Sequence, residues 1–450
     1  MNANRNKYNQ VLVLGAGESG IGAALLAVKN GLEVFVSDAG KIRETYRSQL
    51  VAASIPFEEG GHSRQRIEQA ELIVKSPGIP DNSMALAGID RHKIISEIEF
   101  ASWFTNAKII AVTGSNGKTT TTLLLGHILR QAGFDVGVAG NVGPSFAACL
   151  SQNDHEYFVL ELSSFQLDGI RDLRPDVAIL TNITPDHLDR YGNSFEAYAR
   201  SKFRITQNQL STDYFIYCYD DPETTRLLKE TAPAARCIPF ASGHILAGEG
   251  AYEHHGILRF EIQQNTFDMT LEQLALQGRH NVYNSLAAGL ASKIIGIRNE
   301  TIKMSLSDCQ NVAHRLEYVA NVHGAAYYND SKATNVNSTW YALEMFDRPI
   351  VWIAGGIDKG NDYSQLLPLV SRKVKALICL GRDNSKLIEA FEGVVETIVE
   401  TQSAEHAVSM ASLLSEKNDV VLLSPACASF DLFENYEDRG NQFKKAVRSL

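Results

Sequence analysis

The segment Gly114-Ser-Asn-Gly-Lys-Thr-Thr120 has the residue types and spacing of a loop that binds phosphate groups. The apolar run 108–112 before it predicts a buried strand, and the run 120–129 after it predicts a helix. A glycine-rich turn between a strand and a helix directs backbone N–H groups and the positive end of the helix at an anion. Lys118 adds a positive charge, and the Thr119 hydroxyl can bind a phosphate-bound Mg²⁺. This pattern predicts that the chain binds a nucleoside triphosphate.

Acidic side chains and one histidine follow two further apolar runs of the same region. Glu161 lies at the end of the run 157–162, and Asp186, His187 and Asp189 follow the run 177–181. Because the carboxyl ends of parallel strands meet at one edge of a sheet, we expect these residues beside the phosphate loop. Carboxylate oxygens are ligands that Mg²⁺ takes, so the three loops predict a magnesium-nucleotide site with room for a second cation. The alternative is a lone acid at a strand edge and a structural histidine.

A second glycine-rich turn, Gly15-Ala-Gly-Glu-Ser-Gly20, follows the apolar run 11–14. A helical stretch comes next, and then a strand, 32–38, that ends at Asp38. This is the spacing of a βαβ unit that binds dinucleotides, although such turns also bind other phosphates or serve as simple tight turns. A NAD-dependent dehydrogenase would leave the phosphate loop without a purpose.

The order of the predicted elements indicates three α/β domains, with boundaries near residues 105 and 312. Strands alternate with helices after the phosphate loop and again after residue 313, which is typical of parallel sheets covered by helices. Eight strands are expected beyond the phosphate loop, at 134–138, 157–162, 177–181, 214–217, 325–329, 350–354, 376–380 and 420–423. Short alternating segments from 237 to 277 predict a small antiparallel extension. We expect a Rossmann-like domain at 1–105, a central ATPase-like parallel-sheet domain at 106–312 and a Rossmann-like domain at 313–450.

The composition excludes several classes of protein. A net charge of −10 over 450 residues argues against an electrostatic surface for nucleic acid. The six cysteines form no Cys-x-x-Cys pair, so they predict neither a zinc site nor a disulfide framework. The first ten residues are polar, and no apolar run is long enough to cross a bilayer. We therefore expect a cytoplasmic protein that binds no nucleic acid and does not insert into a membrane.

Four motifs together resemble the Mur ligases of peptidoglycan synthesis, above all their D-glutamate-adding members. They are Thr113-Gly-Ser-Asn-Gly-Lys-Thr119, Glu161-Leu-Ser-Ser-Phe-Gln166, Asn182-Ile-Thr-Pro-Asp-His-Leu-Asp-Arg-Tyr191 and Asn329-Asp-Ser-Lys-Ala-Thr-Asn335. The segments Val421-Leu-Leu-Ser-Pro-Ala-Cys-Ala-Ser-Phe-Asp431 and Arg439-Gly-Asn-Gln-Phe443 resemble the C-terminal signature of those members. The resemblance runs through all three expected domains and implies an ADP-forming amide ligase that is a monomer.

The resemblance also implies an ATP site and two Mg²⁺ sites. The implied ATP contacts are Gly114, Ser115, Asn116, Gly117, Lys118, Thr119, Thr120, Asn281, Asn284, Arg315 and Asp330. The implied metal ligands are Thr119, Glu161, His187 and Lys202, the last as a carbamate formed with CO₂. By itself, Lys202 would be interpreted as a solvated helical lysine, and Asn281 and Asn284 as residues that cap the start of a helix.

Substrate contacts follow from the same resemblance. UDP-N-acetylmuramoyl-L-alanine would bind Gly17, Glu18, Ser19, Asp38, Ser76 and Asn141, with the UDP diphosphate at the first glycine-rich turn. Family members often carry Thr-Arg after the aspartate of the second strand, where this chain has Ala39-Gly40, so we expect Lys41 or Arg43 to contribute to uracil recognition. D-Glutamate would bind Thr334, Lys359, Ser429, Phe430 and Tyr436. Without the resemblance, Lys359 would be interpreted as a flexible loop lysine.

The implied reaction joins the carboxylate of the L-alanine group to the amine of D-glutamate through an acyl phosphate. The catalytic residues would be Lys118, Lys202, His187 and Lys332. Two alternatives stay open: a sister ligase of the Mur or folylpolyglutamate type with a different acceptor, and a non-catalytic nucleotide-binding homologue.

Overall fold

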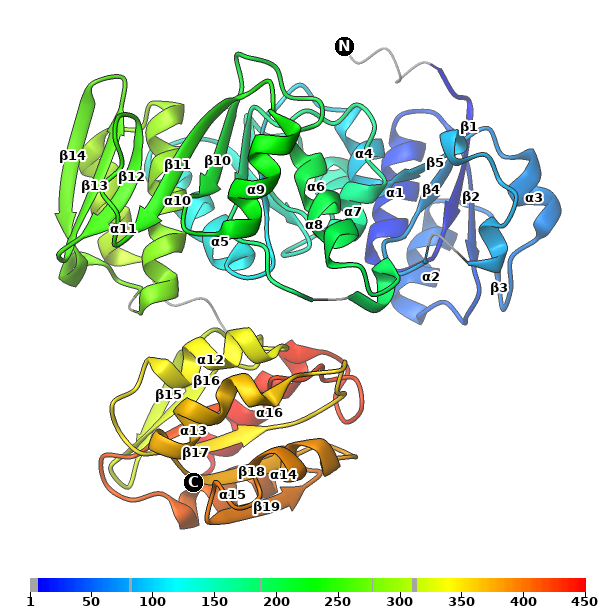
Figure 1. Cartoon of the computed structure of the whole chain (residues 1–450). Coiled ribbons are helices and arrows are strands. Elements are labelled where there is room, and N and C mark those ends of the chain that lie inside the picture. Colours follow the sequence, from blue (N-terminus) through cyan, green and yellow to red (C-terminus); the bar gives the residue numbers. More distant parts are fainter. Residues whose placement is uncertain (1–6, 81–82, 187, 277, 310–313) are drawn as a thin grey trace. The chain divides into compact units, whose positions relative to one another are not determined.

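The computed structural model of the chain (Figure 1) describes residues 7–80, 83–186, 188–276, 278–309 and 314–450. It confirms the expected fold class, a mixed α/β protein with three mainly parallel sheets. The chain forms two compact units. One contains the described residues up to Leu274 together with Asn281–Cys309, and the other contains Ala275–His280 and the described residues from His314 onward. The boundaries expected near residues 105 and 312 stay predictions.

The first sheet is parallel and has the strand order β3-β2-β1-β4-β5. Its strands are β1 (Gln10–Leu14), β2 (Glu33–Asp38), β3 (Phe57–Glu59), β4 (Ile73–Lys75) and β5 (Ile94–Ser96). The connecting helices are α1 (Glu18–Lys29), α2 (Glu44–Ala52), α3 (Arg64–Gln69) and α4 (Glu97–Ser102). Leu12 of β1 pairs with Phe35 of β2 on one side and Ile73 of β4 on the other, so the loops after these three strands meet at one edge.

The second sheet has nine strands in the order β14-β13-β12-β11-β10-β9-β6-β8-β7. Its strands are β6 (Lys108–Thr113), β7 (Val136–Gly140), β8 (Tyr157–Glu161), β9 (Val177–Leu180), β10 (Tyr214–Cys218), β11 (Arg236–Ser242), β12 (Gly250–His254), β13 (Ile257–Ile262) and β14 (Asn265–Thr270). The expected antiparallel extension is confirmed in part: β13 is antiparallel to both β12 and β14, but β11 and β12 still pair in parallel. Helices of this region are α5 (Lys118–Gln131), α6 (Phe146–Gln152), α7 (Ser164–Asp168), α8 (Phe195–Phe203), α9 (Pro222–Thr231), α10 (Arg279–Ile295) and α11 (Asn299–Asp308).

Helices α1 and α4 pack on α6 and join the first two sheets through one continuous apolar core. Gly22 of α1 permits this close approach, because a Cβ atom there would lie 2.5 Å from Ser145 Oγ and 2.7 Å from the backbone N of Ala148. Glu18 accepts a hydrogen bond from the backbone N–H of Ser145 at 3.1 Å. Buried Glu97 of α4 accepts one from Ala147, and burial raises its pKa to about 8.

The third sheet forms the core of the second unit, with the strand order β15-β16-β20-β17-β18-β19. Its strands are β15 (Glu317–Val322), β16 (Ala325–Asn329), β17 (Ile350–Ala354), β18 (Val374–Leu380), β19 (Thr397–Thr401) and β20 (Val420–Leu423), and only the pair β15–β16 is antiparallel. Helices α12 (Val336–Glu344), α13 (Leu367–Lys373) and α14 (Ser385–Phe391) contribute to one apolar cluster, and α15 (Ala404–Leu414) and α16 (Tyr436–Arg448) to another. Among the described helices, none combines the length and the apolar character that crossing a bilayer would need.

Candidate functional site

The phosphate loop lies between β6 and α5, as the sequence predicts, and its glycines meet strict steric limits. Gly117 precedes α5 with φ +83°, and a Cβ atom there would lie 2.3 Å from Asn284 Oδ1. Gly114 has φ +148°, and its Cβ would lie 1.9 Å from Thr181 Oγ1. Both positions therefore need glycine for backbone conformation and for space. Thr120 is buried in the first turn of α5.

Hydrogen bonds fix the loop against the segment that follows β9. Ser115 Oγ donates to the carbonyl of Thr184 at 2.8 Å and lies 3.0 Å from the Tyr198 hydroxyl. The backbone N–H of Asn116 donates to Asn182 Oδ1 at 3.0 Å. The side chain of Ser115 thus ties the loop to Thr184 and Tyr198, and these bonds help to fix the shape of the loop backbone.

Two lysines share one carbonyl oxygen of this loop. Lys118 Nζ donates to Gly114 O at 2.7 Å and to Ser115 O at 2.9 Å. Lys202 Nζ donates to the same Gly114 O at 2.8 Å. The structure therefore brings together two of the expected catalytic lysines, from α5 and from α8.

Lys202 is not a solvated lysine, and that interpretation is wrong. Its residue is only 2% exposed, and its Nζ lies 4.5 Å from the centre of the Tyr198 ring. Burial lowers the pKa of the Lys202 ammonium well below its ordinary value, and the nearby charge of Lys118 lowers it further, while Asp186, Asp168 and Glu161 oppose the shift. Both main effects disfavour the charged form of Lys202 relative to that of a solvated lysine.

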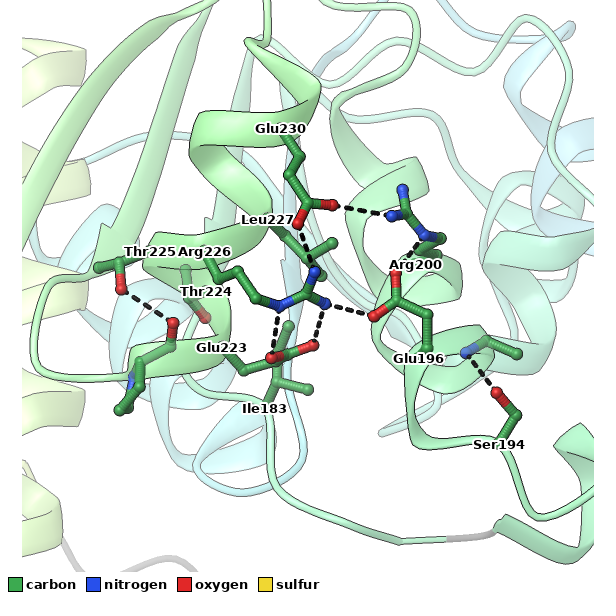
Figure 2. A network of polar contacts seen from close by, with 12 residues as sticks. Ile183, Ser194, Glu196, Arg200, Glu223, Thr224, Thr225, Arg226, Leu227 and Glu230 are labelled. Atoms are coloured by element: carbon green, nitrogen blue, oxygen red, sulfur yellow. Dashed lines mark hydrogen bonds and ion pairs between the residues drawn. The ribbon is translucent and has the colours of Figure 1, made fainter.

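An ion-pair network on the outer side of α8 holds the helix that carries Lys202 (Figure 2). Arg226 of α9 pairs with Glu223 at 2.6 Å, with Glu230 at 2.5 Å and with Glu196 of α8. Arg200 of α8 in turn pairs with Glu230 of α9 at 2.8 Å and with Glu196. Single exposed pairs contribute little, but five linked charges constrain the position of α8 relative to α9.

The expected metal ligands are only partly described. Glu161 ends β8 and is 1% exposed, and its Oε1 accepts a hydrogen bond from Asn141 Nδ2 at 2.8 Å. Thr119 is 3% exposed, and within the described part of the chain its Oγ1 has no hydrogen-bond partner. His187 lies outside the described residues. Within the described ranges, no three His, Cys, Asp or Glu side chains form a group that could hold a metal. Glu161 is the one expected ligand of these four residue types that lies within those ranges.

Asn284 contacts the phosphate loop from α10. Its residue is 4% exposed, its Oδ1 accepts from Thr121 Oγ1 at 3.3 Å, and its Nδ2 donates to Asn281 Oδ1 at 3.1 Å. Helix α10 already begins at Arg279, so the interpretation of Asn281 and Asn284 as helix caps is wrong.

The turns expected to hold the UDP group meet at the carboxyl edge of the first sheet. Asp38 accepts hydrogen bonds from the backbone N–H of Ala16 at 2.6 Å and of Gly40 at 2.7 Å. A Cβ atom on Gly15 would lie 2.8 Å from Ser76 Cβ, so the turns after β1 and β4 are in contact. The first turn of α1 contains Glu18 and Ser19, and Gly17 precedes it. Asn141 is not on this sheet but bonds to Glu161 in the second one. Lys41 and Arg43 are exposed after β2.

In the second unit, a buried carboxylate follows β16. Asp330 accepts from Ser424 Oγ at 2.8 Å and from the backbone N–H of Leu316 at 3.3 Å. Burial raises its pKa to about 7, against the Ser424 hydrogen bond and the nearby charge of Arg315. Lys332 Nζ lies 3.7 Å from the centre of the Tyr436 ring, and Thr334 donates its backbone N–H to Lys332 O at 2.9 Å.

The loops that carry Lys359 and Ser429 are joined by a backbone bridge. Ile357 N–H donates to Ala428 O at 2.8 Å, and Ala428 N–H donates to Ile357 O at 3.2 Å. Lys359 is exposed two residues beyond this bridge, whereas Ser429 is 2% exposed and Phe430 is 68% exposed. The structure thus brings the loops after β17 and β20 together.

Arg439 is a structural residue to which the sequence assigned no role. Its buried guanidinium donates to the carbonyls of Gly355 and Cys427 at 3.2 Å and to that of Ser331 at 2.9 Å, which fixes the loops after β17, β20 and β16. Burial lowers its pKa to about 10, so the group still carries its charge at neutral pH. The sequence contains a signal for the burial of Arg439. Phe443 and Val447 follow it at intervals of four residues, so all three side chains lie on the apolar face of the helix.

Comparisons with known proteins agree with this architecture. Three protein-family models match the chain: "MurD N-terminal domain" over residues 10–84, "Mur ligase middle domain" over 112–292 and "Mur ligase, glutamate ligase domain" over 314–427. The UDP-N-acetylmuramoylalanine–D-glutamate ligase of Christiangramia forsetii is 51% identical over 443 residues, 98% of this chain and 99% of that protein. The enzyme of the same name from Porphyromonas gingivalis is 52% identical over 450 residues, 99% of this chain and all of that protein.

A solved structure shows the same fold at low identity. The UDP-N-acetylmuramate-alanine ligase MurC of Thermotoga maritima aligns with a TM-score of 0.63 and 18% identity over 98% of this chain and 99% of that one. The resemblance inferred from the sequence is confirmed, and the chain belongs to the Mur ligase family.

Proposed function

We propose that the chain joins D-glutamate to UDP-N-acetylmuramoyl-L-alanine with hydrolysis of ATP to ADP and phosphate, in the synthesis of peptidoglycan precursors. Two relatives at 51% and 52% identity over almost their whole length carry the name of this activity. The observation that carries the proposal is the phosphate loop, in which Lys118 and Lys202 converge on Gly114 O beside Glu161 and Thr119. We further propose that the protein acts as a cytoplasmic monomer.

The chemistry has two steps. A carboxylate oxygen of the L-alanine group attacks the γ-phosphorus of ATP, ADP leaves, and an acyl phosphate forms. The D-glutamate nitrogen then attacks the acyl carbon, loses a proton, and phosphate leaves from the tetrahedral intermediate to give the amide. The protein contributes mainly positioning and neutralisation of charge as anions approach one another.

Lys118 is the residue best placed to follow the phosphates. Its Nζ now bonds two loop carbonyls, and it can exchange these for phosphate oxygens without movement of α5, because the four-carbon side chain is flexible. The loop backbone and the N-terminus of α5 supply the remaining N–H donors, with Ser115, Asn116, Gly117 and Thr120 as proposed contacts. Asn281, Asn284, Arg315 and Asp330 are the other proposed ATP contacts.

The residues present fit a magnesium site. Thr119 Oγ1 is a buried oxygen without a partner among the described residues, and Glu161 Oε1 is held by Asn141. We propose that Thr119, Glu161, His187 and a carbamate on Lys202 hold two Mg²⁺ ions. A neutral amine is the form that reacts with CO₂, which is the state that burial favours at Lys202. Bound Mg²⁺ would neutralise phosphate charge and orient the γ-phosphate.

The substrate contacts remain proposals of the same kind. We assign the UDP-linked substrate to Gly17, Glu18, Ser19, Asp38, Ser76 and Asn141. The hydrogen bonds of Asp38 and Asn141 described above also give both residues a role in holding their loops. We assign D-glutamate to Thr334, Lys359, Ser429, Phe430 and Tyr436, with Lys332 next to the reacting groups.

Phosphate release from ATP tests the proposal. Purified protein is assayed with UDP-N-acetylmuramoyl-L-alanine and either D-glutamate, L-glutamate, L-alanine or no amino acid. Release that requires D-glutamate supports the assigned activity. Release with a different amino acid would move the chain to a sister ligase, and a folded, ATP-binding protein that releases no phosphate would be a non-catalytic homologue.

A further inference from the structure

The residue before Lys359 affects whether the Lys359 ammonium is available to bind an anionic ligand. It is exposed in the loop after β17, and within the described ranges no ion pair involves it. The residue directly before it is Asp358, a carboxylate only one peptide unit away. An unengaged carboxylate there would compete with any anionic ligand for the Lys359 ammonium.

Asp358 is fully engaged elsewhere. Lys386 Nζ of α14 pairs with its Oδ1 at 2.7 Å, and the backbone N–H of Gly360 donates to the same oxygen at 2.8 Å. The Tyr363 hydroxyl donates to Oδ2 at 2.9 Å. Burial alone would raise the pKa of Asp358, but the Lys386 ion pair and these hydrogen bonds hold it below its ordinary value.

The other side of the loop is tied to the segment that carries Ser429. Asn361 Nδ2 donates to Ala426 O and to the Tyr363 hydroxyl, each at 3.1 Å. Tyr363 is 5% exposed, and its hydroxyl lies 3.1 Å from Cys427 Sγ. Together with the Ile357–Ala428 bridge, these contacts hold the loop in place. The Lys359 side chain is exposed, and its ammonium forms no ion pair within the described ranges.

We propose that Lys386 is a positioning residue that engages Asp358 and thereby keeps Lys359 available for a carboxylate of the amino-acid substrate. The inference rests on the proposed function, in which Lys359 binds D-glutamate. Lys386 itself touches no substrate. It acts through Asp358, and its removal frees a carboxylate that pairs with Lys359 or pulls the loop out of its position.

Kinetics of Lys386→Gln test the proposal. Lys386 is 62% exposed, so the variant should fold and melt like the wild type. We expect the KM for D-glutamate to rise by about 2- to 5-fold, the range of an exposed ion pair, with kcat and the KM for ATP unchanged. Lys386→Arg should restore the wild-type KM, and the increase should shrink at high salt.

Two further variants separate the possible outcomes. Lys375→Gln is the matched control, because the ion pairs of Lys375 among the described residues are with Asp419, at 2.9 Å, and with Glu416, and it should leave the KM for D-glutamate unchanged. Asp358→Asn combined with Lys386→Gln should bring the KM back toward wild type, since the competing carboxylate is then gone.

The results distinguish this inference from the proposed function. A wild-type protein without D-glutamate-dependent phosphate release would overturn both. An active wild type in which Lys359→Gln raises the KM but Lys386→Gln does not would overturn only the role of Lys386. Equal increases in the KM values for ATP and D-glutamate would show that Lys386 has a purely structural role, and would also overturn it.

Discussion

Replacement of Gly117 by alanine should damage the nucleotide site in a way that can be calculated from the structure. The residue has φ +83°, and a new Cβ atom would lie 2.3 Å from Asn284 Oδ1. Gly133 beyond the other end of α5 offers a matched position, with φ +86° and no atom within 4 Å of its Cβ. The two alanine variants therefore share the backbone strain, and only one of them has the clash.

The expected magnitudes follow from these two terms. A left-handed backbone conformation costs a residue with a side chain about 1–2 kcal/mol. Displacement of the Asn284 amide disturbs its hydrogen bonds with Thr121 and Asn281, each worth about 1 kcal/mol. Gly117→Ala should thus lower the free energy of unfolding by about 3–4 kcal/mol and weaken binding of magnesium-ATP by at least about tenfold. Gly133→Ala should carry only the cost of the left-handed backbone conformation and should bind the nucleotide normally.

Calorimetric titration with a non-hydrolysable ATP analogue and thermal melting measure both effects. The double variant Gly117→Ala with Asn284→Ala has no clash. Adding Gly117→Ala to Asn284→Ala should therefore lower the melting temperature only as much as Gly133→Ala lowers that of wild type. Equal melting temperatures for the two single alanine variants would refute the steric argument. Wild-type affinity in Gly117→Ala would refute the assignment of the loop to the nucleotide.

Three further predictions concern charged side chains. Lys118→Ala should abolish turnover, with a loss of at least about 100-fold in phosphate release and an unchanged melting temperature, and near-normal activity would contradict its role. Lys202→Ala should be almost inactive and partly rescued by formate or acetate in the assay, and the absence of rescue would argue against the carbamate alone. Relative to wild type, Glu97→Gln should stabilise the protein increasingly as pH rises from about 5 to about 8, and the difference should level off above that. The pKa of Glu97, raised from 4.5 to about 8, means that the folded wild type binds more protons than the unfolded one between these values, so its stability falls through this range. A difference in melting temperature between wild type and Glu97→Gln that stays constant across these pH values would contradict this prediction.

Local signals predicted the fold well wherever a strand is apolar throughout. The strands expected at 325–329, 350–354 and 420–423 coincide with β16, β17 and β20, and all of their residues except Tyr328 are buried. Strands β15 and β19 were not predicted, because as edge strands they contain few fully buried side chains and their patterns are weak. The order of strand, glycine-rich loop and helix around Gly114–Thr120 was predicted correctly, since the glycines, lysine and threonine that indicate it are contiguous in the sequence.

The rest of the site depends on contacts between distant residues. Lys202 donates a hydrogen bond to Gly114, 88 residues away, and no local sequence pattern predicts such a pair. A partial signal did exist, because Tyr198 and Ala199 lie on the same face of α8 and are buried with it. The contact of Asp330 with Ser424 likewise joins two strand ends that are adjacent only in the folded sheet.

The position of β20 in the third sheet determines when this sheet can form during synthesis. Although β20 is the last strand of the chain, it lies between β16 and β17 in the interior of the sheet. Helix α16 comes still later and supplies Arg439. The strands of the first unit, by contrast, are complete by Thr270 and its helices by Asp308. On the ribosome, the first unit can therefore fold before β20 is synthesised, whereas β16 and β17 keep unpaired edges and exposed apolar faces, which favour aggregation, until β20 is available to pair between them.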